Sequence, residues 1–249
     1  AKTFMDSSGH NETDVSALIA DLECSEKPII RAAVNALVSL AETSAELRDR
    51  LHRRMGDPQV KNLWAVAYVL AHLPQSSRDV TQRLLESLGH HDPDIRWAIG
   101  LLLAHLANRD EEITRQLLRL CTAGNALQRR MAIYCLRDLG LQDAESTEAF
   151  FLALRDPDPL VRIAAAAGLK KKTHLDWHAK DTLLTVFLED PDNRVRSVAA
   201  VTLAQVGEPS ERFLQALNLA ESSENEQIRR AANAALSLLE NKRAAPSGS

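Results

Sequence analysis

Aromatic residues are scarce in this chain. Phe, Trp and Tyr make up 4% of its 249 residues, whereas hydrophobic residues of all kinds make up 45%. A core with few rings has to be filled mainly by Ala, Leu and Val, and Ala and Leu are strong helix formers that let helices pack closely. Glycine and proline are also sparse, at nine residues each, so few positions force the backbone out of a helix. The composition therefore favours an all-α protein.

Cysteine and long apolar runs are equally limited. The three cysteines, Cys24, Cys121 and Cys135, are odd in number and irregularly spaced, which is typical of reduced thiols in a reducing compartment. No run approaches the roughly 18 apolar residues of a membrane span, and the first residues lack a secretory apolar segment. We therefore expect a cytoplasmic protein without a membrane partner.

The charge balance disfavours one class of partner. The chain has 30 Lys and Arg against 34 Asp and Glu, a formal net charge of -4. Such a chain has no general electrostatic attraction to phosphate or to anionic lipid. Nucleic acid is therefore an unlikely partner on composition alone.

A repeat runs through the sequence. The stretch DPDPLVRIAAAAGLKK at 156–171 returns as DPDNRVRSVAAVTLAQ at 190–205. With Arg162 as position 0, the steps between equivalent residues are 33 residues, once 34. Position 0 is occupied by Ile30, Leu63, Arg96, Arg129, Arg162, Arg196 and Arg229. Self-similarity at a fixed period of this length indicates a solenoid.

Each repeat has the pattern of two helices joined by a turn. A Leu stands seven residues after position 0 in every repeat, and Leu or Phe stands twelve residues before it. One repeat, for example, predicts helices over 81–89 and 95–107, and Asp or Asn four residues before position 0 is a good N-cap for the second helix. The expected fold class is an all-α α-solenoid, a right-handed superhelix of about seven helix-turn-helix repeats.

The register DxxVRxxAAxxL resembles HEAT repeats, most closely the HEAT-like repeats of the phycobilisome (PBS) lyase type. The resemblance covers roughly residues 14–240 and implies a single solenoid domain over 13–241, between a flexible segment at 1–12 and a disordered tail at 242–249. HEAT-like repeats of this type occur in lyase subunits, scaffolds and adaptors, so the resemblance implies a fold more than a function.

The charged residues that recur with the repeat allow two interpretations. They could bind phosphates, or they could form a structural ladder of salt bridges between neighbouring repeats, which we favour because it would set the register of stacking. The predicted ladder consists of Arg96, Arg129, Arg162, Arg196, Arg229, Asp92, Asp158 and Asp192. The basic pairs at 53–54, 129–130 and 229–230, with the lysines at 170–172, keep a weak nucleic-acid binder as an alternative.

A candidate binding surface lies on the second helices of repeats two to four. Positions +1, +5 and +8 after position 0 point away from the Leu stripe and, in HEAT-type solenoids, toward the concave side. At +1 and +5 the sequence places Trp64, Tyr68, Trp97, Leu101, Arg130 and Tyr134, and His72 and His105 at +9 flank them. Trp, Tyr and Arg are enriched in binding hot spots. The alternative is that these rings only fill space between helices.

Signs of catalysis are few. Deoxyhypusine hydroxylase-like HEAT enzymes need His-Glu pairs to bind iron, and the chain contains no His-Glu dipeptide. His174 and His178 are four residues apart with Asp176 between them, but a third metal ligand is not evident. Two of the cysteines stand at positions typical of burial. We therefore expect no metal, no cofactor and no catalytic residue.

The sequence thus predicts a non-catalytic scaffold or adaptor that binds a protein partner on the concave face. A lyase-type or maturation-factor subunit acting on a client protein is the alternative, and a weak nucleic-acid binder is a further one.

Overall fold

The computed structural model describes residues 12–74, 77–206 and 208–244. These residues form fourteen α-helices and no strand. The helices are α1 (Glu12–Asp21), α2 (Lys27–Thr43), α3 (Ala45–Met55), α4 (Leu63–Ala71), α5 (Arg78–Ser87), α6 (Pro93–Ala107), α7 (Glu111–Ala123), α8 (Ala126–Leu139), α9 (Ala144–Ala153), α10 (Pro159–Leu169), α11 (Trp177–Glu189), α12 (Asn193–Gln205), α13 (Glu211–Glu221) and α14 (Glu226–Ala244). They make seven helix pairs in the predicted register, so the all-α solenoid class is confirmed.

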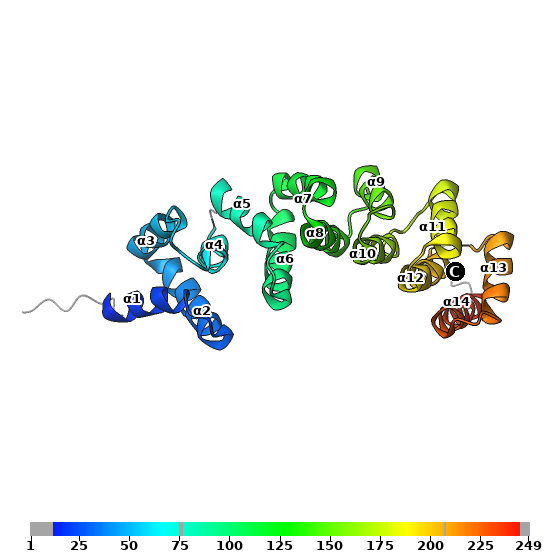
Figure 1. The fold of residues 1–249 in the computed structure, drawn as a ribbon. Coiled ribbons are helices and arrows are strands. Elements are labelled where there is room, and N and C mark those ends of the chain that lie inside the picture. Colours follow the sequence, from blue (N-terminus) through cyan, green and yellow to red (C-terminus); the bar gives the residue numbers. More distant parts are fainter. Residues whose placement is uncertain (1–11, 75–76, 207, 245–249) are drawn as a thin grey trace, which may run out of the picture. The chain divides into compact units, whose positions relative to one another are not determined.

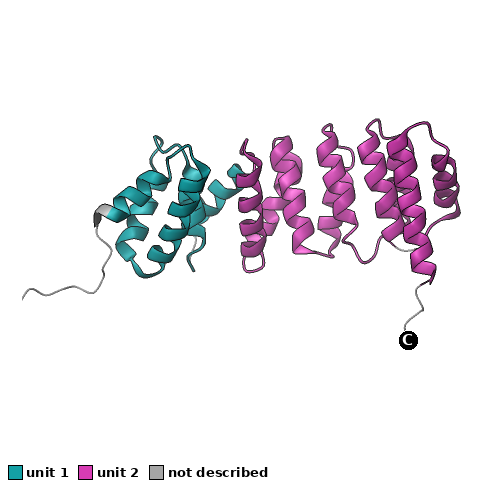
Figure 2. Cartoon of the chain, turned by 90° about the horizontal axis from the view of Figure 1, so that it is seen from below, with its two compact units in different colours: residues 1–87 teal, residues 88–249 magenta. Residues whose placement is uncertain are grey.

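The chain divides into two compact units, residues 1–87 with α1 to α5 and residues 88–249 with α6 to α14 (Figure 2). A single domain over 13–241 therefore stays a prediction. Most of the segments predicted to be flexible, 1–11 and 245–249, lie outside the described residues. At the two ends of the described region, α1 begins at Glu12 and α14 continues to Ala244, so residues 242–244 are helical.

The second unit is built in two layers. The second helices of successive repeats, α6, α8, α10, α12 and α14, each pack on the next. The first helices α7, α9, α11 and α13 each pack on the second helix of their own pair. In Figure 1 α7, α9 and α11 lie above their partners, and α13 lies at the right end. One side of the second-helix layer is therefore covered by first helices, and the other side is left without a covering layer.

The leucine column explains why the pairs stack. Leu103, Leu136 and Leu169 are at most 1% exposed, and Phe150 stands on the partner helix α9 at 1% exposure. Burial of one such side chain contributes roughly 1.5–3 kcal/mol. Leu236, in the last described pair, is only half-buried.

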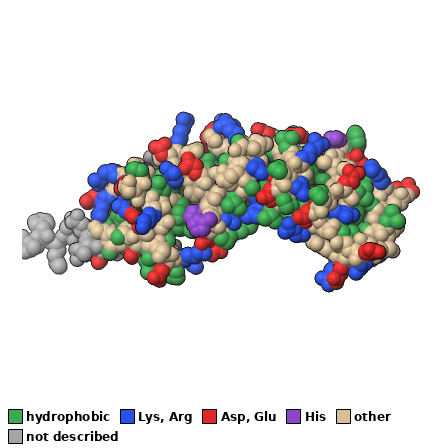
Figure 3. Space-filling view, in the orientation of Figure 1, with side chains coloured by type: hydrophobic (Ala, Val, Ile, Leu, Met, Phe, Trp, Pro, Cys, Tyr) green, Lys and Arg blue, Asp and Glu red, His purple; other side chains and the backbone are tan. Residues whose placement is uncertain are grey.

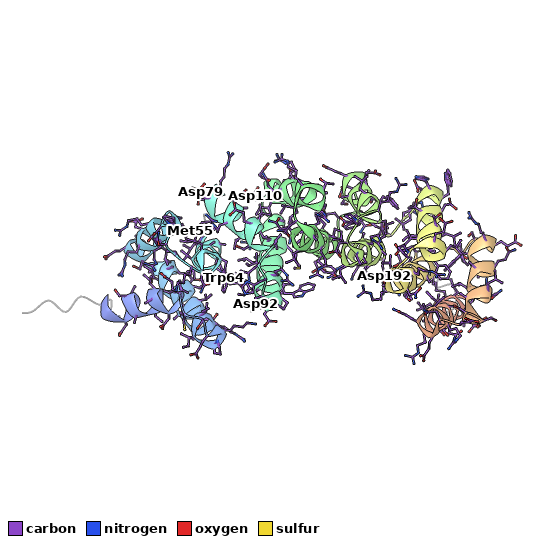
Figure 4. The ribbon with its side chains drawn as sticks, in the orientation of Figure 1. Met55, Trp64, Asp79, Asp92, Asp110 and Asp192 are labelled. Carbon is purple, nitrogen blue, oxygen red and sulfur yellow. The ribbon has the colours of Figure 1, made fainter. Side chains whose placement is uncertain are left out.

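The helix starts follow the predicted capping residues. The side chains of Asp92, Asn125, Asp158, Asp192 and Asn225 each accept a hydrogen bond from a backbone N–H in the first turn of their helix. Such a bond satisfies one of the amide groups that a helix leaves unpaired at its start. Figure 4 labels Asp92 and Asp192 at the starts of α6 and α12.

The longest loop of the second unit, residues 170–176, is held by a buried lysine. The Lys172 ammonium group donates hydrogen bonds to the Leu141 carbonyl at 2.7 Å and to the Ser146 hydroxyl at 2.6 Å, and it lies 5.3 Å from the Phe150 ring centroid. Lys172 is 5% exposed, and burial lowers its pKa. The one extra residue of the repeat period is thus absorbed in an anchored loop, and Lys172 contributes no surface charge.

Replacing a leucine of the buried column should destabilise the second unit strongly. We expect Leu169→Ala to lower the free energy of unfolding by about 2–5 kcal/mol, because a cavity replaces a side chain that is 0% exposed. Leu219→Ala is the matched control, since Leu219 is 78% exposed on α13 and surface changes are usually within about 0.5 kcal/mol. Urea unfolding followed by circular dichroism measures both; equal transitions would contradict the packing described.

Candidate binding surface

A glycine brings α6 and α8 close together. A Cβ atom at Gly100 would lie 3.2 Å from the Met131 Cε and 3.4 Å from the Cys135 Sγ. The Cys135 thiol donates a hydrogen bond to the Gly100 carbonyl at 3.4 Å. Side chains that stand beside this contact on the uncovered side of the two helices can therefore meet.

Trp97 of α6 and Tyr134 of α8 meet in this way. Their ring centroids are 5.1 Å apart with an interplanar angle of 23°, a stacked pair. The Arg137 guanidinium lies 4.8 Å from the centroid of the Tyr134 ring, within the range of a cation–π interaction. Trp97 remains 41% exposed, and Leu101 one turn further along α6 is 61% exposed. The α6–α8 junction thus presents a preorganised aromatic and aliphatic surface.

The predicted surface residues fall into two sets. In the second unit Trp97, Leu101, Arg130, Tyr134 and His105 stand on α6 and α8, where Arg130 and Tyr134 are half-buried and His105 is exposed. Trp64, Tyr68 and His72 belong to the first unit.

In the first unit Trp64 and Tyr68 lie on α4, and His72 is the residue directly after it. Trp64, labelled in Figure 4, and Tyr68 are half-buried. The His72 ring lies 4.8 Å from the Tyr68 ring, and its Nδ1 is 2.8 Å from the Tyr68 carbonyl. Burial raises the pKa of Tyr68. The Trp64 and Tyr68 rings are thus partly buried, whereas Trp97 and Leu101 are exposed to solvent.

The uncovered side of the second unit also has an unusual charge. We call it the second-helix face and define it by positions +1, +5 and +8 of α6, α8, α10, α12 and α14. These positions hold Trp97, Leu101, Ala104, Arg130, Tyr134, Arg137, Ile163, Ala167, Lys170, Ser197, Val201, Ala204, Arg230, Ala234 and Ser237. Four are cationic and none is acidic, although the whole chain carries a net charge of -4.

A hollow continues the second-helix face toward α14. It has a volume of about 470 Å³ and is lined by residues of α10, α12 and α14, among them Ala167, Val201 and the cations Lys170 and Arg230. Ala167, Ser197 and Val201, which line the hollow, are smaller than the side chains at the same positions on α6 and α8. Figure 3 shows cationic and hydrophobic side chains along the underside of the molecule, where these helices lie.

The arginines of position 0 each hold the turn of their own repeat. In four of these arginines, the guanidinium group donates a hydrogen bond to a backbone carbonyl five or six residues earlier. The fifth, Arg196, donates from Nε to the Phe187 carbonyl at 2.7 Å. The four distances are 2.5 Å from Arg96 to His90, 2.8 Å from Arg129 to Gly124, 2.8 Å from Arg162 to Asp156 and 2.6 Å from Arg229 to Ser223. The four carbonyl groups belong to the turn after the first helix, whereas Phe187 lies in the last turn of α11.

Two of these arginines also bridge to the next repeat. Arg129 donates from Nε and Nη2 to Asp156 at 2.6 and 2.7 Å, and Arg162 does the same to Asp190 at 2.8 and 2.9 Å. Both aspartates are at most 7% exposed at the side chain. Hydrogen bonding to these carboxylates raises the pKa of Arg129 and Arg162.

The predicted ladder was therefore wrong in its acidic partners. Asp92, Asp158 and Asp192 cap helices, and Asp158 and Asp192 act on Arg129 and Arg162 only as nearby charges. The bridging carboxylates stand six residues before position 0, two residues earlier than predicted. The caps occupy the first turn of the helix, so their oxygens are directed at its amides and not across to the neighbouring repeat.

The column six residues before position 0 is the signal that sequence reasoning missed. Its side chains accept a hydrogen bond from the backbone N–H two residues later in six of the seven repeats: Cys24, Asp57, His90, Asp156, Asp190 and Ser223. The exception is Ala123, which has no acceptor; there the Asn125 N–H is bound by Gln128 Oε1 at 3.0 Å in a capping box.

Because of Ala123, Arg96 lacks the salt bridge that Arg129 and Arg162 make with the next repeat. Arg96 is 7% exposed, and its Nε is shielded from solvent without a hydrogen-bond partner among the described residues. Burial, and next the charge of Arg130, lower the pKa of Arg96. Arg96 thus holds its own turn but lacks the carboxylate that Arg129 and Arg162 bind.

The described cysteines and histidines do not gather into a metal site. Burial raises the pKa of the Cys121 and Cys135 thiols to about 12, so both are protonated at neutral pH. No group of three His, Cys, Asp or Glu among the described residues could hold a metal ion. Asp176, between His174 and His178, caps α11 through the Ala179 N–H. In the described part of the chain no helix has the length and apolar character to cross a membrane.

Known proteins resemble the chain at the level of repeat and fold. Residues 147–237 match the family model described as HEAT repeats, and no curated protein sequence matches. The chain is similar to solved structures of an engineered protein from the Northeast Structural Genomics Consortium (17% identity, TM-score 0.44, 92% of this chain and 99% of that one), of human deoxyhypusine hydroxylase in complex with glycerol (16%, 0.38, 92% and 97%) and of a designed armadillo repeat protein (15%, 0.39, 90% and 99%).

Breaking one bridge between repeats should cost more than removing a turn contact alone. We expect Arg162→Met to lower the free energy of unfolding by about 3–5 kcal/mol, because the Asp190 carboxylate is left buried without its cation. Arg196→Met is the comparison, since the hydrogen bond of Arg196 goes to a backbone carbonyl, and it should cost about 1–3 kcal/mol. Calorimetry of both variants measures the difference; a smaller loss for Arg162→Met would refute the role of the bridge.

Acid should weaken the turn that contains His90. Burial, and next the charge of His91, lower the pKa of His90 from 6.5, and its Nδ1 accepts a hydrogen bond from the Asp92 N–H at 3.0 Å. Because the unfolded chain binds the proton more readily, stability present above about pH 6.5 is lost as the pH falls through the lower folded pKa. The thermal midpoint should fall less between about pH 7 and pH 5 in His90→Asp than in the wild type, while exposed His105→Gln behaves as wild type.

Proposed function

We propose that the second-helix face of the second unit binds another protein and that the chain acts as a non-catalytic scaffold or adaptor. The observation that carries this proposal is the exposure of Trp97 and Leu101, at 41% and 61%, on a helix layer without a cover. Neither side chain is needed to complete the core, since the leucine column already fills it. Large exposed apolar side chains placed together are typical of an interaction surface.

The geometry of the α6–α8 junction supports this function. Trp, Tyr and Arg dominate the energetics of protein interfaces, and the Trp97–Tyr134 stack with Arg137 brings one of each together. Because the stack forms within the chain itself, a partner would have to immobilise few side chains on binding. The cations and the small residues on α10, α12 and α14 extend the surface for a longer partner segment.

Two alternatives remain on the same surface. A lyase-type or maturation-factor subunit would also have to hold a client protein, and the repeat register that resembles the PBS lyase type supports it. A weak nucleic-acid binder is supported by the cations of the second-helix face together with its rings. Against the latter, Arg129, Arg162 and Arg229 are turned toward their own repeats, and Lys172 is buried. A location in the cytoplasm is likewise our proposal.

Loss of Trp97 should remove the partner. Affinity capture with the full chain from a cell lysate should recover a protein that Trp97→Ala loses by more than about tenfold, the effect of removing a hot-spot side chain. Leu219→Ala removes an equally apolar and even more exposed side chain from α13 and should capture as wild type. Trp64→Ala tests the first unit separately.

The proposal fails if Trp97→Ala captures the same proteins as the wild type while circular dichroism shows both folded. Capture that survives about 0.5 M salt favours apolar anchoring of a protein. A steep loss of capture with salt, together with nucleic acid in the bound material, favours the nucleic-acid binder.

A further inference from the structure

We infer that Arg96, together with Arg130, is the acceptor for a carboxylate group of an acidic partner segment. This inference rests on the proposed function, because it names the chemistry of the partner that the second-helix face would bind. It starts from the gap that Ala123 leaves in the column six residues before position 0.

The two following repeats show what fits this gap. In them the Nε and Nη2 atoms of the position 0 arginine donate hydrogen bonds to both oxygens of an aspartate from the next repeat, with all four distances between 2.6 and 2.9 Å. Arg96 has the same register and the same contact with its own turn, made through Nη1. Its next repeat offers the methyl group of Ala123 where the others offer a carboxylate.

An arginine buried in this way needs an anion. Arg96 is 7% exposed, yet its Nε is without a hydrogen-bond partner among the described residues. Burial, and next the positive charge of Arg130, lower the pKa of Arg96, and the nearby negative charge of Asp92 offsets only part of this effect. A carboxylate placed between the two guanidinium groups would pair the buried Nε–H and remove their repulsion.

The surroundings indicate an acidic protein segment as the source of this carboxylate. Trp97 follows Arg96 directly and is exposed together with Leu101, so the acceptor adjoins an apolar anchor. Further along the same face Lys170 can attract an additional acidic side chain, whereas Arg137 and Arg230 already pair with Asp138 and Glu226 within the chain.

The test uses Ala123→Asp, which supplies the missing carboxylate from within the chain. The matched control is Thr122→Asp, since Thr122 is exposed next to Ala123 and the substitution adds the same charge at the same helix end. The probe is a fluorescent random copolymer of glutamate and tyrosine, which offers carboxylates and rings together. Anisotropy at low salt measures its binding to the full-length chain, and thermal unfolding reports the stability of each variant.

We expect Ala123→Asp to raise the unfolding temperature above that of Thr122→Asp and to weaken copolymer binding about tenfold more than the control does, because the internal aspartate occupies Arg96. The Arg96 Nε–H signal in a nitrogen-15 spectrum should move in the wild type on addition of the copolymer and should stay fixed in Ala123→Asp. Equal stability and equal binding of the two variants would overturn the inference. So would tighter binding of polyuridylate than of the copolymer, which assigns the site to phosphate.

The outcomes separate this inference from the proposed function. If Trp97→Ala loses the captured protein but Ala123→Asp and Thr122→Asp behave alike, the surface stands as a protein-binding site and the Arg96 acceptor is wrong. If the wild type fails to bind the copolymer at low salt, the acidic partner is likewise wrong.

Discussion

The second unit depends on the way an arginine ties down the turn between two helices. The turn between the two helices contains carbonyl groups that no helical amide pairs, and the arginine at position 0 of the second helix donates to them from inside the same repeat. The turn and the second helix are thereby fixed to each other before any neighbour is added. Because the two helices of each pair are held in one arrangement, the leucine column of each repeat meets that of the next, and the helices form two layers.

The same guanidinium has further N–H groups, and their use differs along the stack. Where the following turn carries Asp156 or Asp190, the remaining N–H groups join one repeat to the next. Where it carries Ala123, the guanidinium is buried without this bond. The residue six places before position 0 therefore decides whether an arginine bonds only within its own repeat or also to the neighbouring one.

Much of this could be predicted from the sequence because it depends on period and local chemistry. The 33-residue period located all seven helix pairs, and the Asp and Asn caps act through bonds to the next few residues. The acidic partners of the arginines could not be predicted in the same way, since they depend on how one turn faces the next repeat. The binding residues were predicted as one row, but exposure is set by tertiary packing: Trp97 is left open, whereas Trp64 is half-buried.

The gap at Ala123 also has a mechanical consequence for the second unit. Among the described residues, α6 and α8 adhere through apolar contacts such as those of Gly100, Met131 and Cys135, whereas α8 to α10 and α10 to α12 are additionally bridged by charges. Apolar cohesion weakens on cooling and is strengthened by excluded salts, while ion pairs are lost when acid protonates the carboxylates. The junctions of this stack thus differ in what loosens them, and in acid the α6–α8 junction keeps its cohesion where the two junctions that follow it lose part of theirs.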